Sequence, residues 1–112
     1  MKIYISGKIT DEDYAVAYLK FKTYETKLTK LGHDVVNPLN HIDHRATWVD
    51  AMKKAIMLMM DCDTIFQLPD WTQSPGAKIE FELAAKLSFQ IFTEKDMYHL
   101  KVMNKLQNKQ NA

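Results

Sequence analysis

Short apolar segments and longer amphipathic segments alternate along this chain of 112 residues, and the alternation limits the folds that it can adopt. The short segments are rich in β-branched and aromatic residues, which is typical of strands. The longer segments carry apolar residues at every third or fourth position, which is typical of helices. Strands that alternate with helices form a parallel sheet with helices on both faces. The sequence therefore predicts an α/β fold with about four strands, expected at 2–6, 33–36, 64–68 and 89–93.

Capping residues and glycine predict where the helices begin and end. We expect Thr10 to cap the first helix, with the acidic residues 11–13 in its first turn and Gly32 at its end. Ser74 and Pro75 are typical of the start of another helix, as the cap and the first helical residue. Further helices are expected through Trp48, Met52, Ala55, Ile56 and Met59, through Leu83, Ala84 and Leu87, and from Glu94 onward, with Met97, Leu100, Met103 and Leu106.

Composition excludes several classes of protein. The length allows a single domain over residues 1–112, whose polar end from about residue 104 is expected to fray. One cysteine, Cys62, excludes an internal disulfide and a multi-cysteine zinc site. A net charge of +1 argues against a nucleic-acid polymer as partner. The longest apolar run, residues 55–60, is too short to span a membrane, and the opening residues are not expected to be a signal peptide. We therefore expect a cytoplasmic protein.

Parallel sheets of this kind bind ligands beyond the carboxyl ends of their strands. The loops at 7–10, 37–45 and 68–76 should lie there. In the first loop, Gly7, Lys8 and Thr10 follow Tyr4 and together offer backbone N–H groups, a cation and hydroxyls. Taken alone, a tyrosine in a strand more often packs in the sheet, and a lysine in a loop is more often a surface charge. The spacing matches neither a dinucleotide-binding nor a P-loop motif.

Glu80 is the residue with the most informative position. Its neighbours three, four and seven positions on are Leu83, Ala84 and Leu87, so the carboxylate should lie on the apolar face of its helix. A buried carboxylate is costly unless it is paired or used. Near a helix N-terminus it could act as a nucleophile or stabilise an oxocarbenium ion. The alternative is a glutamate that pairs with a lysine.

Several other residues have both a structural and a functional interpretation. Ser74 could simply cap the helix, or together with Gly76 form an anion site at its N-terminus. Trp71 could stack on a base or cover the core. His41 and His44 lack further ligands at a convincing spacing, so we expect no metal site, and no motif calls for a cofactor.

The segments MKIYISGKIT (residues 1–10), VVNP (residues 35–38) and residues 62–84 resemble the nucleoside 2-deoxyribosyltransferase-like superfamily, in particular its small phage and bacterial branch. The resemblance also extends to 2′-deoxynucleoside 5′-monophosphate N-hydrolases. It implies a flavodoxin-like sheet and chemistry at the N-glycosidic bond. It also implies that Glu80 is the nucleophile, that Tyr4 orients it, and that Ser74, Gly7, Lys8 and Thr10 bind a phosphate. Ser74 stands where the transferases have an aspartate, which favours nucleotides over nucleosides.

One position departs from this family. Ala55 stands where the family has the aspartate that protonates the leaving base, and neither Asp50 nor Asp61 is placed to replace it. The first hypothesis is therefore an N-glycosidase or deoxyribosyl transferase that acts on a nucleotide. The second is a nucleotide-binding or nucleotide-sequestering protein with little turnover, and the third is a structural protein with a vestigial pocket. Small proteins of this fold commonly complete their sites with a second subunit, so we also expect a homo-oligomer.

Overall fold

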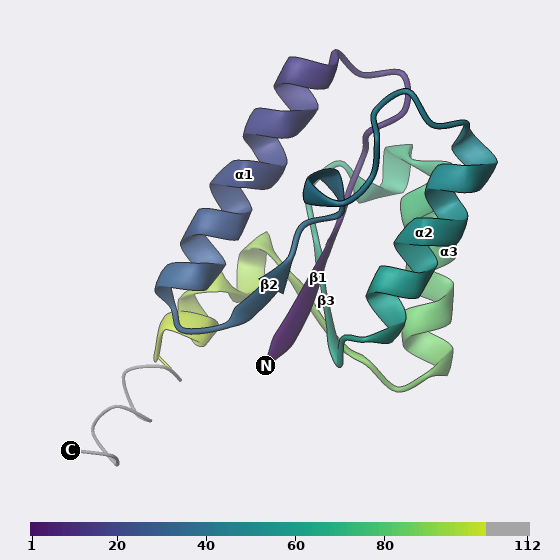
Figure 1. Ribbon diagram of the computed structural model, residues 1–112. Coiled ribbons are helices and arrows are strands. Elements are labelled where there is room, and N and C mark those ends of the chain that lie inside the picture. The colour runs from purple at the N-terminus through teal and green to yellow at the C-terminus, as the bar shows by residue number, and fades with distance from the viewer. Residues whose placement is uncertain (103–112) are drawn as a thin grey trace.

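A four-stranded parallel sheet in the order β2–β1–β3–β4 forms the centre of the protein, as the sequence predicts. The computed structural model describes residues 1–102. The strands are β1 (Lys2–Ser6), β2 (Asp34–Val36), β3 (Thr64–Gln67) and β4 (Gln90–Thr93). They are connected by α1 (Tyr14–Lys30), α2 (Trp48–Met60) and α3 (Pro75–Lys86) (Figure 1). Short 3-10 turns occur at η1 (Pro38–Asn40), η2 (Trp71–Gln73) and η3 (Glu94–Asp96).

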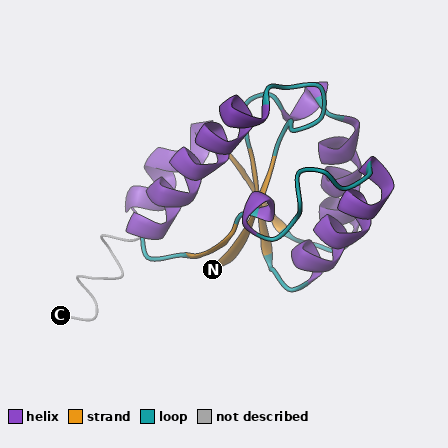
Figure 2. Cartoon of the chain, turned by 45° about the horizontal axis from the view of Figure 1, so that its top comes forward, coloured by secondary structure: helices purple, strands orange, loops and turns teal. Residues whose placement is uncertain are grey.

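Alternate residues of β1 face two different layers of helices. Ile3 and Ile5 pack with Phe21 and Leu28 of α1 on one face of the sheet. On the other face, Tyr4 packs with α2 and α3, through Ala55, Met59 and Ala84. Figure 2 shows the strands between these two helical layers. Side chains of consecutive strand residues point to opposite faces, so β1 contributes aliphatic residues to one core and polar residues to the other layer.

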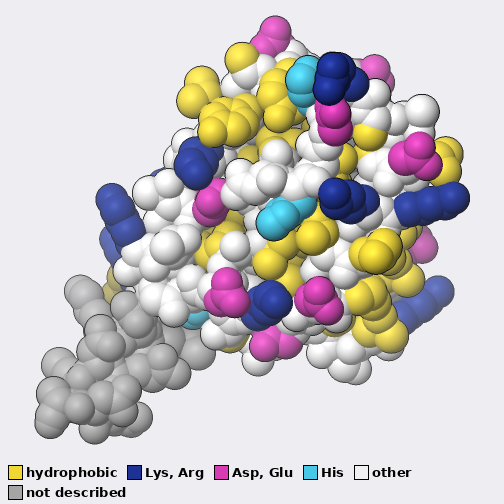
Figure 3. Space-filling model, in the orientation of Figure 1, with side chains coloured by type: hydrophobic (Ala, Val, Ile, Leu, Met, Phe, Trp, Pro, Cys, Tyr) yellow, Lys and Arg dark blue, Asp and Glu magenta, His cyan; other side chains and the backbone are white. Residues whose placement is uncertain are grey.

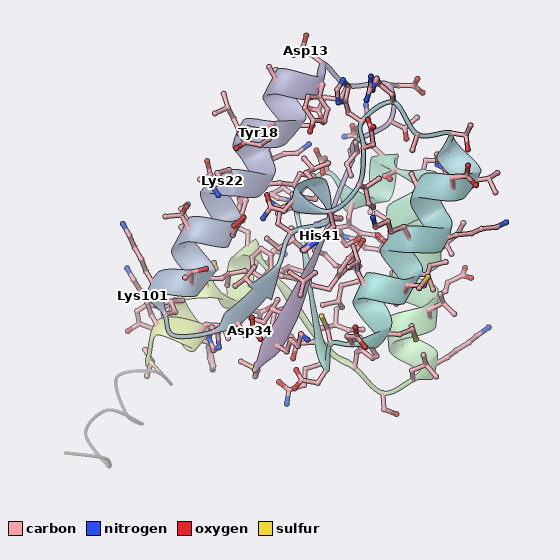
Figure 4. All side chains as sticks on the ribbon, viewed as in Figure 1. Asp13, Tyr18, Lys22, Asp34, His41 and Lys101 are labelled. Atoms are coloured by element: carbon pink, nitrogen blue, oxygen red, sulfur yellow. The ribbon has the colours of Figure 1, made fainter. Side chains whose placement is uncertain are left out.

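The first helix starts later than the sequence predicts. Thr10 is not its cap; the helix begins at Tyr14, and Asp13 accepts hydrogen bonds on Oδ1 from the backbone N–H groups of Ala15 and Val16 (Figure 4). Asp11 has a φ of 64°, a left-handed conformation that cannot continue a right-handed helix. Residues 10–12 consequently belong to the loop after β1, and Thr10 is exposed.

The end of the chain also differs in detail from the prediction. Glu94 starts a 3-10 turn, and residues 97–102 are helical, with Leu100 buried against the α1 side of the sheet. This segment therefore covers the sheet; Met103, Leu106 and the expected frayed tail lie outside the described residues. Leu87, expected on the apolar stripe of α3, is 52% exposed because it caps the helix after the last buried turn.

Charged side chains of both signs are interspersed over the surface shown in Figure 3. No helix among the described residues is long and apolar enough to cross a membrane.

Gly7 directly follows β1, at a position where no side chain fits. A Cβ atom there would lie 2.8–3.0 Å from Cδ1, Cβ and Cγ of Leu68, the residue that follows β3. Leu68 is fully buried and donates its backbone N–H to the carbonyl of Ser6, so it has little room to move. This contact fixes the loop after β1 against the loop after β3.

We predict that Gly7→Ala lowers the free energy of unfolding by about 1–3 kcal/mol, because the added methyl overpacks this contact. Urea denaturation measures the change. The single variant Leu68→Ala should cost about 2–5 kcal/mol. The double variant should lose less than the sum of the two, because alanine at position 68 removes two of the three close contacts, those of Cγ and Cδ1. Strict additivity of the two losses would contradict the proposed contact.

Candidate active site

A cavity of about 330 Å³ opens at the carboxyl end of β1. Its walls come from β1, α2, α3, the start of α1 and the loops that follow β1 and β2. The order of the strands places β1 between β2 and β3, and the helices that follow β1 and β3, α1 and α3, cover opposite faces of the sheet (Figure 1). The cavity is therefore where parallel sheets bind ligands, as the sequence predicts.

Glu80 is the carboxylate in the wall of this cavity, and it is only 5% exposed. The hydroxyl of Tyr4 donates a hydrogen bond to Glu80 Oε2 at 2.5 Å, and Ser6 Oγ donates to Glu80 Oε1 at 2.8 Å. Burial raises the pKa of Glu80 to about 7, although both hydrogen bonds lower it. Burial of Glu80, expected from the apolar face of its helix, is confirmed, and its contact with Tyr4 agrees with what the family resemblance implies.

The two hydroxyls hold the carboxylate in one orientation. Burial, followed by the charge of Glu80, raises the pKa of Tyr4 well above its usual value, so the phenol keeps its proton and stays a donor. With one donor on each oxygen, the ionised carboxylate is the form that this arrangement matches. Glu80 also lies in the second turn of α3, near the positive end of the helix dipole. At neutral pH a substantial share of this buried group is ionised.

Ser6 is the residue of this site that sequence reasoning missed. It lies two positions after Tyr4 on the same strand, so both side chains point to the same face of the sheet. Because Tyr4 was expected beside Glu80, the two-residue repeat of the strand could have predicted that Ser6 also faces Glu80. Sequence reasoning treated the strand as ending in a turn and gave this serine no role.

Four other predicted residues line the cavity: Gly7, Thr10, Ser74 and Gly76. Ser74 caps α3, since its Oγ accepts a hydrogen bond of 3.1 Å from the backbone N–H of Ala77, as predicted. A Cβ at Gly76 would lie 2.8 Å from the sulfur of Met52, so glycine allows α2 and α3 to approach closely here.

The remaining two predicted residues do not line this cavity. The backbone N–H of Lys8 donates to Asp70 Oδ1 at 3.1 Å, and its carbonyl accepts from Lys20 Nζ at 3.0 Å. Lys8 thus helps to connect the loop after β1 to the loop after β3. Trp71 packs on Phe81, with 4.9 Å between ring centroids, and lines a second cavity beyond β3.

Ala55 lines the cavity, so the side chain at this position is a methyl group and not an acid. Besides Glu80, the lining holds two carboxylates, Glu12 and Asp43. Glu12 forms an ion pair with Lys20 at 2.5 Å. Hydrogen bonds from Arg45 hold the pKa of Asp43 below its usual value, so Asp43 is a poor proton donor. Within residues 1–102 no group of three or more His, Cys, Asp or Glu side chains could hold a metal ion.

Residues 1–93 match the model of a family described as a domain of unknown function, DUF4406, and the chain belongs to that family. No curated protein matches the sequence. Among solved structures, the chain is similar to one titled as a 2-deoxyribosyltransferase from the psychrotolerant bacterium Bacillus psychrosaccharolyticus. The TM-score is 0.62 at 17% identity, over 83% of this chain and 71% of that chain. The likeness shows that the two share a Rossmann-like α/β fold.

We predict that Glu80 makes the stability of the protein depend on pH. Its pKa is about 7 when folded and near 4.5 when unfolded, so between these values the folded state holds a proton that the unfolded state has released. The free energy of unfolding should therefore fall as the pH rises through this window. Urea denaturation at pH 5 and pH 8 should show this difference to be larger in the native protein than in Glu80→Gln by roughly 2 kcal/mol. Equal pH dependence in both proteins would contradict the raised pKa.

Proposed function

We propose that this protein cleaves the N-glycosidic bond of a nucleoside or nucleoside 5′-monophosphate, with Glu80 as the nucleophile. The observation that carries the proposal is the buried Glu80 carboxylate, held by Tyr4 and Ser6 in the wall of a cavity. The likeness in fold to a protein titled as a 2-deoxyribosyltransferase supports it. A deoxyribose is the sugar that this likeness favours.

The reaction has two steps at the anomeric carbon of the sugar. In the first, an oxygen of ionised Glu80 attacks C1′, a C–O ester bond forms, and the C1′–N bond breaks with its electron pair going to the base. The base takes up a proton as it leaves. In the second step, water or a second base attacks C1′ and releases Glu80. Tyr4 and Ser6 orient the carboxylate, and their hydrogen bonds keep it available in the ionised form.

The predicted substrate-binding residues extend this proposal. Gly7, Thr10 and Gly76 bring backbone or a small side chain to the cavity, and Ser74 lies at the N-terminus of α3, where anions are favoured. Ser74 is the feature that supports a 5′-monophosphate. Trp71 and Lys8 do not line the cavity, and in this proposal they would contact the substrate from the neighbouring loops. Assembly into a homo-oligomer remains part of the proposal, and light scattering tests it.

The second candidate function is binding of a nucleotide or nucleoside with little turnover. Ala55 is the observation that favours it, because a methyl group occupies this wall of the cavity and cannot protonate a leaving base. Loss of a general acid typically lowers a rate by about 10²–10⁴-fold. A protein with this substitution would hold its ligand and release the base slowly.

We predict that the native protein releases free base from at least one member of a panel of deoxynucleosides and their 5′-monophosphates, measured by chromatography. Glu80→Gln should lose this activity by at least about 10³-fold, because the amide is not a nucleophile. Glu82→Gln, on an exposed position of the same helix, is the matched control and should keep the native rate. Unchanged release in Glu80→Gln would refute Glu80 as the nucleophile. No release by the native protein, together with binding, would favour the second candidate function.

A further prediction concerns the missing acid. Ala55→Asp should raise the rate of base release, up to about 10²-fold, because a carboxyl group then lines the cavity and can protonate the base. Ala55→Asn is the matched control, since it has nearly the same shape and cannot supply the proton in this way. If both variants release base at the same rate, the absence of an acid at this position does not limit the reaction.

A further inference from the structure

The residues that line the cavity include three carboxylates and no lysine or arginine among those that the structure describes. Glu80 of α3 lies in the wall of the cavity, while Glu12 and Asp43 come from the loops after β1 and β2. A site that binds a phosphate dianion ordinarily supplies a cation or several free backbone N–H groups. This composition bears directly on which form of substrate the cavity takes.

Two cations beside the cavity, Lys20 and Arg45, are already paired with acids, and Lys8 does not line the cavity. Lys20 Nζ contacts Glu12 Oε2 at 2.5 Å and Asp70 Oδ2 at 2.5 Å. Arg45 donates to both oxygens of Asp43, from Nε at 3.2 Å and from an Nη atom at 3.0 Å. A phosphate would have to take either cation from its carboxylate and leave that carboxylate unpaired beside the new dianion.

Two weaker sources of positive charge remain at the cavity. His44 lines it, and its Nδ1 lies 3.8 Å from Asp43 Oδ1. The N-terminus of α3 carries a partial charge of roughly +0.5, but Ser74 already accepts the N–H of Ala77 there. Neither matches the charge of a phosphate dianion, and ionised Glu80 would repel it.

The rest of the lining is suited to an uncharged ligand that carries a ring. Aromatic side chains stand at the cavity from two elements and a loop: Tyr14 and His44 lie with 4.7 Å between ring centroids, and Trp48 lines the same space. Aliphatic side chains of Pro38, Leu39 and Ile42 complete this side. Burial of an uncharged ring against such walls is favourable, whereas a desolvated dianion without a partner is not.

We infer that the cavity takes an uncharged nucleoside in preference to its 5′-monophosphate. The inference rests on the proposed function, and it differs from the preference for nucleotides that Ser74 suggests. The selectivity comes from charge: Lys20 and Arg45 beside the cavity are paired with Glu12, Asp70 and Asp43, and the lining itself contributes carboxylates.

Calorimetric titration of the native protein with carbocyclic deoxynucleosides and their 5′-monophosphates tests this inference. In these probes a carbon replaces the ring oxygen, so no oxocarbenium ion forms and binding is read without cleavage. One purine and one pyrimidine pair should be used. The nucleoside should bind at least about tenfold more tightly than its monophosphate, which corresponds to about 1.4 kcal/mol. A monophosphate that binds as tightly as the nucleoside, or more tightly, would overturn the inference.

A charge added at the cavity gives a second, independent readout. Ala46→Lys places a cation on the lining loop and should improve binding of the monophosphate by several fold, with little change for the nucleoside. Val49→Lys, on an exposed position of α2 outside the lining, is the matched control and should leave the ratio unchanged. Equal responses of the two variants would count against the inference.

These titrations separate this inference from the proposed function. Tight nucleoside binding without release of base from any natural substrate would refute the proposed enzymatic activity and support the inferred preference for nucleosides. Cleavage of monophosphates only would support the proposed enzymatic activity and refute the inferred preference for nucleosides. Absence of binding by both probes would refute the inference.

Discussion

The hydrogen bond between Tyr4 and Glu80 is the interaction on which the site depends. It joins the first strand of the chain to its third helix, 76 residues apart in sequence. A carboxylate that is 5% exposed is expensive to ionise, and the raised pKa of Glu80 records this cost. The donors on β1, Tyr4 and Ser6, reduce the cost and fix the orientation of the group. The strand at the centre of the sheet therefore sets the chemical state of the candidate nucleophile.

The topology explains why these groups meet beside a cavity. In the order β2–β1–β3–β4, the connections from β1 and from β3 run to opposite faces of the sheet. Glycine at position 7 lets the loop after β1 lie directly on Leu68, and Gly76 lets α3 approach Met52 of α2. Both glycines line the cavity together with Tyr4. Ala55 also lines this space, where its methyl group fills little volume.

Features that depend on local pattern could be predicted from the sequence, and features that depend on distant partners could not. The alternation of segments predicts the sheet and its layers, the stripe around Glu80 predicts its burial, and Ser74 with Pro75 predicts the start of α3. The start of α1 was misplaced because a left-handed Asp11 has no clear sequence signal. The pairing of Lys20 with Asp70, 50 residues away, could not be predicted from local pattern. The position of Ser6 could have been predicted, because residues two apart on a strand face the same side of the sheet.

The central claim is that the Glu80 carboxylate becomes covalently bonded to the sugar. Mass spectrometry of the intact protein, quenched during turnover with a 2′-fluoro deoxynucleoside, tests it most directly, because the fluorine slows both steps and prolongs the ester. The account predicts a mass increase of one fluorodeoxyribosyl group, which peptide mapping assigns to Glu80, and no increase in Glu80→Gln. Release of the base without any adduct on the native protein, or an adduct on a different residue, would contradict it.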